Sequence, residues 1–150
     1  MDKLKIYLDN CCYNRPFDDQ TQIKIRLEAT AKRYIQSLIK FKSLVLYSSF
    51  MSFREIDDIP FPSIKEHISD FVKENTSVFI SDENISKVKP LSEEIMEAGI
   101  KKKDATHIAC SVIAKCDYFI TTDRRVINYK TDKIKIVNPI EFAEIWRNLT

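Results

Sequence analysis

The chain has 150 residues, of which 24 are Lys or Arg and 22 are Asp or Glu, so its formal net charge is only +2. This length and a hydrophobic content of 44% exclude a disordered chain and predict a single domain over residues 1–150. Gly99 is the sole glycine, which excludes the glycine-rich loops of P-loop and dinucleotide-binding proteins, and we expect no nucleotide cofactor.

The first forty residues predict a strand followed by a long helix. Leu4, Ile6 and Leu8 alternate with other residues, and the pattern stops at Asp9. Asp18 or Asp19 is placed to cap a helix that ends near Lys40. We expect the inner face of this helix to carry Ile23, Leu27, Ala31, Tyr34, Ile35 and Leu38.

Further short strands alternate with helices along the rest of the chain. Strands are predicted at residues 44–47, 78–80, 118–121 and 134–137. Ser48 or Ser49 opens a short helix, and Ser63 with Glu66 has the spacing of a capping box. Helical pattern resumes near 83, again after Pro90 up to Gly99, over 105–115, and from Pro139 to the end.

Strands that alternate with helices favour a parallel sheet covered on both faces. The predicted fold class is therefore α/β, with a three-layer α/β/α sandwich around a short, mainly parallel sheet. In such folds ligands bind at the carboxyl ends of the strands. The residues that follow each strand are thus the first candidates for a functional site.

Four acidic residues are placed at or near this edge. Asp9 and Asp123 follow strands, Glu55 lies on a short helix after a strand, and Asp104 begins a helix that leads into one. Clustered carboxylates repel one another, and a divalent cation relieves this repulsion. Oxygen ligands suit Mg²⁺ or Mn²⁺ better than Zn²⁺. Taken singly, Asp104 also fits a helix cap, Asp123 a turn and Glu55 a solvated helix position.

Basic residues accompany each acid along the chain, which suits a phosphate backbone that crosses a metal site. Such charge neighbours are also common on solvated surfaces. The candidate phosphate contacts are Arg15, Arg54, Lys103, Arg124 and Arg125.

Five segments, in order, resemble the PIN domain (PilT N-terminus) superfamily, which includes the VapC-type ribonuclease toxins. They are LDN at 8–10, SSFMSFREI at 48–56, KDATHIA at 103–109, FITTD at 119–123 and IVNPIEF at 136–142. In this resemblance Asp9, Glu55, Asp104 and Asp123 match the catalytic and metal-binding acids. Thr121 matches a supporting polar position, and Asn10 either assists the site or ends the strand.

The resemblance implies a metal-dependent endoribonuclease that hydrolyses RNA with Mg²⁺ or Mn²⁺, as the toxin of a toxin–antitoxin pair. It also implies an antitoxin partner and a homodimer. The alternative is a PIN fold that binds RNA or protein without cutting. An aspartyl-nucleophile phosphatase is disfavoured, because Cys11 stands where that family needs a second Asp. His107 is expected to have a packed or hydrogen-bonded structural role rather than that of a catalytic base.

The compartment expected from the sequence is the cytoplasm. No apolar run is long enough to cross a bilayer, so no membrane association is expected, and the first residues lack the pattern of a secretory signal. The four cysteines form no CxxC pair, and we expect free structural thiols that suit a reducing environment.

Overall fold

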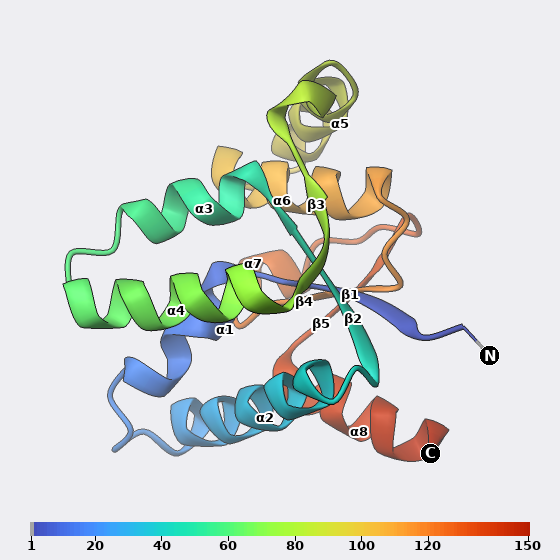
Figure 1. Cartoon of the computed structure of the whole chain (residues 1–150). Coiled ribbons are helices and arrows are strands. Elements are labelled where there is room, and N and C mark those ends of the chain that lie inside the picture. The colour runs from blue at the N-terminus through green and yellow to red at the C-terminus, as the bar shows by residue number, and fades with distance from the viewer. Residues whose placement is uncertain (1) are drawn as a thin grey trace.

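The computed structural model describes residues 2–150 and contains a five-stranded sheet in the order β3-β2-β1-β4-β5 (Figure 1). Every neighbouring pair of strands is parallel. The strands are β1 (Leu4–Leu8), β2 (Leu44–Ser49), β3 (Thr76–Ile80), β4 (Tyr118–Ile120) and β5 (Lys135–Val137). The α/β class that the sequence predicts is confirmed.

Helices cover both faces of the sheet, which gives the expected three layers. In Figure 1, α5 and α6 lie on one side of the sheet, and α2 and α8 lie on the other. The α-helices are α1 (Asn10–Asn14), α2 (Ile23–Lys40), α3 (Phe50–Asp57), α4 (Pro62–Asn75), α5 (Ile85–Glu97), α6 (Lys102–Ile113), α7 (Arg124–Ile127) and α8 (Pro139–Leu149). Two 3₁₀ turns are η1 (Arg15–Phe17) and η2 (Asp82–Asn84).

Each face of the sheet has its own hydrophobic core, because successive side chains of a strand point to opposite faces. In β1, Ile6 and Leu8 pack with α2, α4 and α8, whereas Tyr7 packs with α5 and α6. The ring of Tyr7 stacks on Phe119 of β4 at a centroid distance of 5.4 Å. The central strands β1 and β4 are thereby held between two apolar layers, and their carboxyl ends are fixed in place.

The prediction for the inner face of α2 is wrong for three of its residues. Ile23, Leu27 and Tyr34 are exposed, while Glu28 and Lys32 are buried. Ile35, as predicted, is fully buried. The local pattern gave no sign of this, because the partner that pairs with Glu28 comes from another segment of the chain.

Several helix boundaries also differ from the predictions. The prediction of a capping box at Ser63 and Glu66 is wrong, because α4 begins at Pro62 and its N-cap residue is Phe61. Pro90 lies inside α5 and does not divide the helical pattern. Gly99 has a φ of 97°, which confirms the left-handed position expected directly after the end of a helix.

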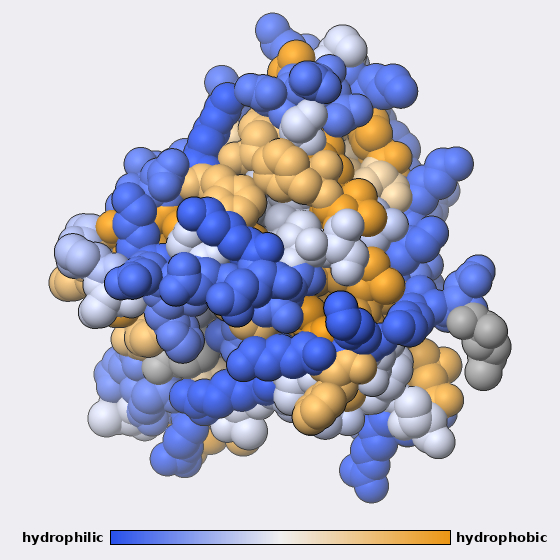
Figure 2. Space-filling model, in the orientation of Figure 1, coloured by the Kyte–Doolittle hydropathy of each residue, from blue (hydrophilic) through white to orange (hydrophobic). Residues whose placement is uncertain are grey.

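Strand β3 forms one edge of the sheet, and its side chains Val78 and Phe79 are exposed. The ring of Phe53 on α3 contacts Phe79 edge-on. Figure 2 shows hydrophobic residues gathered on the face where β3 runs, bordered by hydrophilic ones. Within residues 2–150, no helix has the length and apolar character that crossing a membrane requires.

Candidate metal site

Asp9 stands at the carboxyl end of β1, where the strand turns directly into α1. Its carboxylate caps this helix, with Oδ1 accepting a hydrogen bond from the backbone N–H of Asn10 at 2.8 Å. Oδ2 accepts a second hydrogen bond from the Thr121 hydroxyl at 2.9 Å. Burial raises the pKa of Asp9 above its usual range, although the positive charge of His107 and the Thr121 hydrogen bond act in the opposite direction. The carboxylate is therefore held rigidly in a place that disfavours its charge.

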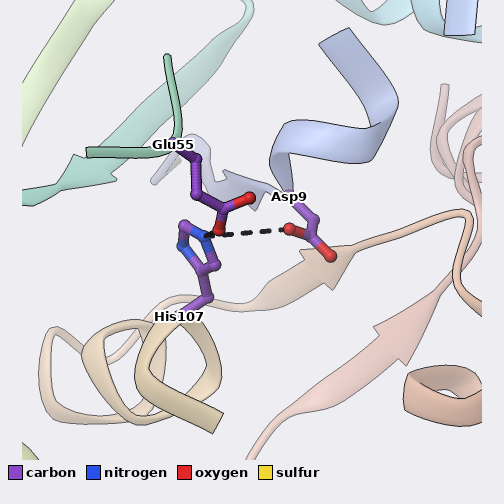
Figure 3. Close-up of side chains that lie close together, drawn as sticks. All are labelled: Asp9, Glu55 and His107. Carbon is purple, nitrogen blue, oxygen red and sulfur yellow. Dashed lines mark hydrogen bonds and ion pairs between the residues drawn. The ribbon is translucent and has the colours of Figure 1, made fainter. Parts of the chain in front are cut away.

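Glu55 on α3 and His107 on α6 meet beside Asp9, as Figure 3 shows. Nε2 of His107 donates a hydrogen bond to Oε1 of Glu55 and lies 3.9 Å from Oδ1 of Asp9. Burial lowers the pKa of His107, but the Glu55 hydrogen bond and the negative charges of Asp9 and Glu55 outweigh it, and the net shift is upward. The two carboxylates thus favour the positive form of the His107 ring, whose charge offsets part of theirs.

The other nitrogen of the His107 ring, Nδ1, contacts a group of hydroxyls. Nδ1 lies 2.5 Å from the Tyr7 hydroxyl, which also contacts Ser49 Oγ at 2.6 Å and Ser52 Oγ at 3.2 Å. Because a carboxylate only accepts, Nε2 carries a proton; Nδ1 accepts from the Tyr7 hydroxyl in the neutral ring and donates to it in the positive one. These contacts fix the direction in which His107 presents its proton to Glu55. His107 is buried and hydrogen-bonded, as expected, and a structural role in place of that of a catalytic base stays a prediction.

Asp104 and Asp123 border this group. Asp104 lies in the first turn of α6, one turn before His107, and Asp123 caps α7 by accepting from the backbone N–H of Arg125 at 2.9 Å. Burial, together with the negative charges of Asp9 and Asp123, raises the pKa of Asp104 to about 6. The four predicted acids therefore share one electrostatic environment, although Asp104 and Asp123 stand outside the tightest group.

The donor set fits a divalent cation. Ligand atoms of Asp9, Glu55 and His107 all lie within 4.8 Å of one another. Burial is the main cause of the raised pKa values of Asp9 and Asp104, and the negative charges of neighbouring carboxylates raise them further. The carboxylates of Asp9 and Glu55, with that of Asp104 close by, suit Mg²⁺ or Mn²⁺. Of these two metals, the adjacent imidazole of His107 favours Mn²⁺.

Thr121 and Asn10, predicted as supporting residues, lie beside the acids. Thr121 Oγ1 accepts a hydrogen bond from the Asp123 backbone N–H at 3.1 Å, so this hydroxyl joins Asp9 to the Asp123 segment. The Asn10 side chain donates from Nδ2 to the carbonyl of Ser52 at 3.0 Å, which ties β1 to the first turn of α3. Among residues 2–150, its buried Oδ1 has no hydrogen-bond partner.

Of the five residues predicted to contact phosphate, two are already paired with acidic side chains in the described part of the chain and three are not. Arg15 is bound to Asp18 and Glu28, both at 3.0 Å, and Lys103 lies 3.7 Å from Asp58. Arg54 is exposed, and its guanidinium carbon lies 5.1 Å from the centre of the Phe50 ring. Arg124 and Arg125 are exposed on α7, next to Asp123. Their contact with phosphate stays a prediction.

The sequence interpretation missed that His107 joins the acid group and that Tyr7 supports it. A signal for His107 was available, since Asp104 and His107 are three residues apart on one helix and residues at this spacing share a face. Tyr7 gave no such signal, because an aromatic residue in a strand is most often a core residue.

Neither the models of known protein families nor the curated proteins match this sequence. A chain of the crystal structure of VapBC2 from Rickettsia felis, bound to a DNA fragment from their promoter, is similar in structure. The TM-score is 0.57 at 12% sequence identity, and the similarity covers 90% of this chain and 98% of that chain. At this identity the likeness concerns the fold, and it supports the PIN-like architecture that the sequence motifs predict.

Proposed function

We propose that this protein is a metal-dependent endoribonuclease that hydrolyses phosphodiester bonds of RNA. The observation that carries the proposal is the convergence of Asp9, Glu55 and His107, with ligand atoms within 4.8 Å, at the carboxyl edge of a parallel sheet. Asp104 and Asp123 border this group and share its charge.

Each residue has a separate role in this proposal. Asp9, Glu55, Asp104 and Asp123 hold one or two Mg²⁺ or Mn²⁺ ions. When bound, such an ion lowers the pKa of water and neutralises charge on the phosphate. Thr121 fixes the direction of the Asp9 carboxylate, and His107 positions Glu55 through its proton on Nε2.

The proposed biological setting is a toxin–antitoxin pair. The sequence motifs resemble the VapC-type toxins, and the similar solved structure is of VapBC2, which supports this setting. An antitoxin protein and a second copy of the chain are the proposed partners, and the cytoplasm is the proposed compartment.

One observation favours a second candidate, a PIN fold that binds RNA or protein without cutting. Oε1 of Glu55 accepts a hydrogen bond from His107, so this oxygen is already engaged by a group of the chain itself. If the hydrogen bond between Glu55 and His107 persists when metal is present, fewer carboxylate oxygens are left to bind the ion. A nuclease requires that a divalent cation compete successfully with this contact.

The experiment that separates the two candidates incubates the purified protein with total RNA in Mg²⁺, in Mn²⁺ and in EDTA. We expect cleavage with either metal and none in EDTA. The Asp9→Asn variant is expected to lose cleavage, while Asp132→Asn, an exposed carboxylate in the loop before β5, cuts at the parental rate. Cleavage by Asp9→Asn at the parental rate would contradict the assignment. RNA binding without cleavage in any metal would favour the binding module.

A further inference from the structure

A small cavity of about 240 Å³ opens between α3, α5 and α6. Its apolar wall consists of Phe50, Met51 and Ile85, and Ser92 and Thr106 also line it. Three cationic side chains complete the lining, one from each helix: Arg54, Lys89 and Lys102. We call these three residues the cation triad.

The cation triad lacks acidic partners in the part of the chain that the structure describes. None of the described residues that line the cavity is acidic. The ion pairs found in residues 2–150 involve other cations and include none of the three. In a chain with a net charge of +2, three unpaired cations around one cavity make a local positive field that attracts an anion.

A larger cavity shows that cations without acidic partners are not a general feature of the cavities of this protein. About 760 Å³ in volume, it lies along β5 and the loop before it. Its lysines are accompanied by Asp117 and Asp132, and Lys133 lies 3.4 Å from Glu94. The lysines of the larger cavity thus have carboxylates close by, whereas the cation triad has none among the described residues that line its cavity.

The small cavity adjoins the metal site through two helices. On α3, Arg54 directly precedes Glu55, and on α6 Thr106 directly precedes His107. Lys102 and Asp104 lie in the same turn of α6, which is about 5.4 Å of helix axis. The cavity and the metal site therefore draw their residues from the same turns of α3 and α6.

We propose that this cavity is a subsite for one nucleotide of single-stranded RNA, next to the phosphodiester bond that is cut. The cation triad takes the phosphate of that nucleotide, and Phe50, Met51 and Ile85 contact its sugar or base. The inference rests on the proposed nuclease function for its substrate, but it concerns residues outside the metal site.

The chemistry of the lining matches a nucleotide more closely than a free anion. The hydroxyls of Thr106 and Ser92 donate to carbonyls of their own helices, at 2.8 and 2.9 Å, so their oxygens remain free to accept from a ribose hydroxyl or a base. The guanidinium of Arg54 over Phe50 offers a flat surface on which a base stacks. A volume of about 240 Å³ is roughly that of eight molecules of liquid water and admits one phosphate with its sugar.

The test measures RNA binding without cleavage, so that its result does not depend on nuclease activity. A short fluorescein-labelled single-stranded RNA is titrated with protein in EDTA at several salt concentrations. Lys89→Glu is compared with Lys87→Glu, which makes the same charge change two residues away on α5, outside the cavity. Both lysines are exposed, and thermal unfolding of each variant checks that the fold is intact. Lys102→Gln provides the same test from α6.

We expect Lys89→Glu to raise the Kd for RNA about tenfold and to lower the salt dependence by about one phosphate contact. Lys87→Glu is expected to change the Kd by less than about threefold, because its charge lies outside the cavity. Equal Kd values for the two charge reversals would overturn the subsite. If Lys89→Glu instead loses binding of a labelled polyglutamate peptide and keeps RNA binding, the cavity takes an acidic protein segment and the proposal is wrong. Absence of cleavage with metal, beside a selective loss of RNA binding in Lys89→Glu, would refute the nuclease and leave the subsite in place.

Discussion

Thr121 and Asp9, which are 112 residues apart in the sequence, are joined by a hydrogen bond of 2.9 Å between the threonine hydroxyl and the aspartate carboxylate. The two residues follow the neighbouring strands β4 and β1, whose register pairs Leu8 with Ile120. The same hydroxyl accepts from the backbone N–H of Asp123 at 3.1 Å. One threonine thus links the ends of two strands that each carry an acid of the proposed metal site.

The Thr121→Val variant tests this link. Valine keeps the shape of threonine but cannot donate to Asp9, so the carboxylate loses a fixed direction and its pKa rises further. We expect RNA cleavage in Mn²⁺ to slow about tenfold, as is typical when a group that orients a metal ligand is removed. Thr122→Val, at the neighbouring buried position, serves as the control and is expected to cut at the parental rate. Equal rates for both variants would show that Thr121 has no such role.

Asp104 makes the stability of the metal-free protein depend on pH. Burial and the charges of Asp9 and Asp123 raise its pKa from 3.8 to about 6. Between these two values the folded protein binds more protons than the unfolded chain, so this residue lowers stability as the pH rises through that window. We expect Asp104→Asn to be more stable than the parent above about pH 6 and equally stable below about pH 4. Urea unfolding in EDTA at several pH values measures this, and a difference independent of pH would refute it.

The ion pair between Arg15 and Glu28 is expected to stabilise the fold. Arg15 Nε lies 3.0 Å from Glu28 Oε1, and the Glu28 side chain is fully buried. Removing the arginine leaves a buried carboxylate without its partner, so we expect Arg15→Ala to lower the free energy of unfolding by about 3 kcal/mol. In the Arg15→Ala, Glu28→Gln double variant the loss is expected to be smaller than the sum of the single changes. An Arg15→Ala protein within about 0.5 kcal/mol of the parent would show that the pair adds nothing to stability.

Lys32 is expected to reduce stability near neutral pH. Its side chain is buried beside the Tyr13 ring, and burial lowers its pKa to about 8. Between about 8 and the ordinary value of 10.5 the unfolded chain binds more protons, so the contribution of Lys32 becomes less unfavourable as the pH rises. We expect Lys32→Met to stabilise the protein by about 2 kcal/mol below pH 8 and by less at higher pH. Thermal unfolding across this range checks the trend, and a destabilised Lys32→Met protein would contradict it.

The strands and the acids at their ends could be predicted because their signals are local. Alternating or continuous apolar residues mark β1 and β4, and the acid that follows each strand is read directly from the sequence. Parallel pairing then places the ends of neighbouring strands at one edge, which brings Asp9 and Asp123 into the same region without any knowledge of side-chain contacts.

The inner face of α2 and the partners of His107 could not be predicted, because they depend on contacts between distant segments. Glu28 is buried because Arg15 of η1 reaches it, and no helical periodicity encodes that pairing. His107 binds Glu55, 52 residues away, and Tyr7, 100 residues away. Lys89 belongs to the cation triad only because α5 packs against α6.

The measurement that tests the central claim most directly is calorimetric titration of Mn²⁺ into the parent protein and into Asp9→Asn at neutral pH. The account predicts saturable binding by the parent and binding at least about tenfold weaker in Asp9→Asn, with Asp132→Asn unchanged from the parent. Equal Mn²⁺ affinity in the parent and in Asp9→Asn, or absence of binding by the parent, would contradict a metal site built on the carboxyl ends of β1 and β4.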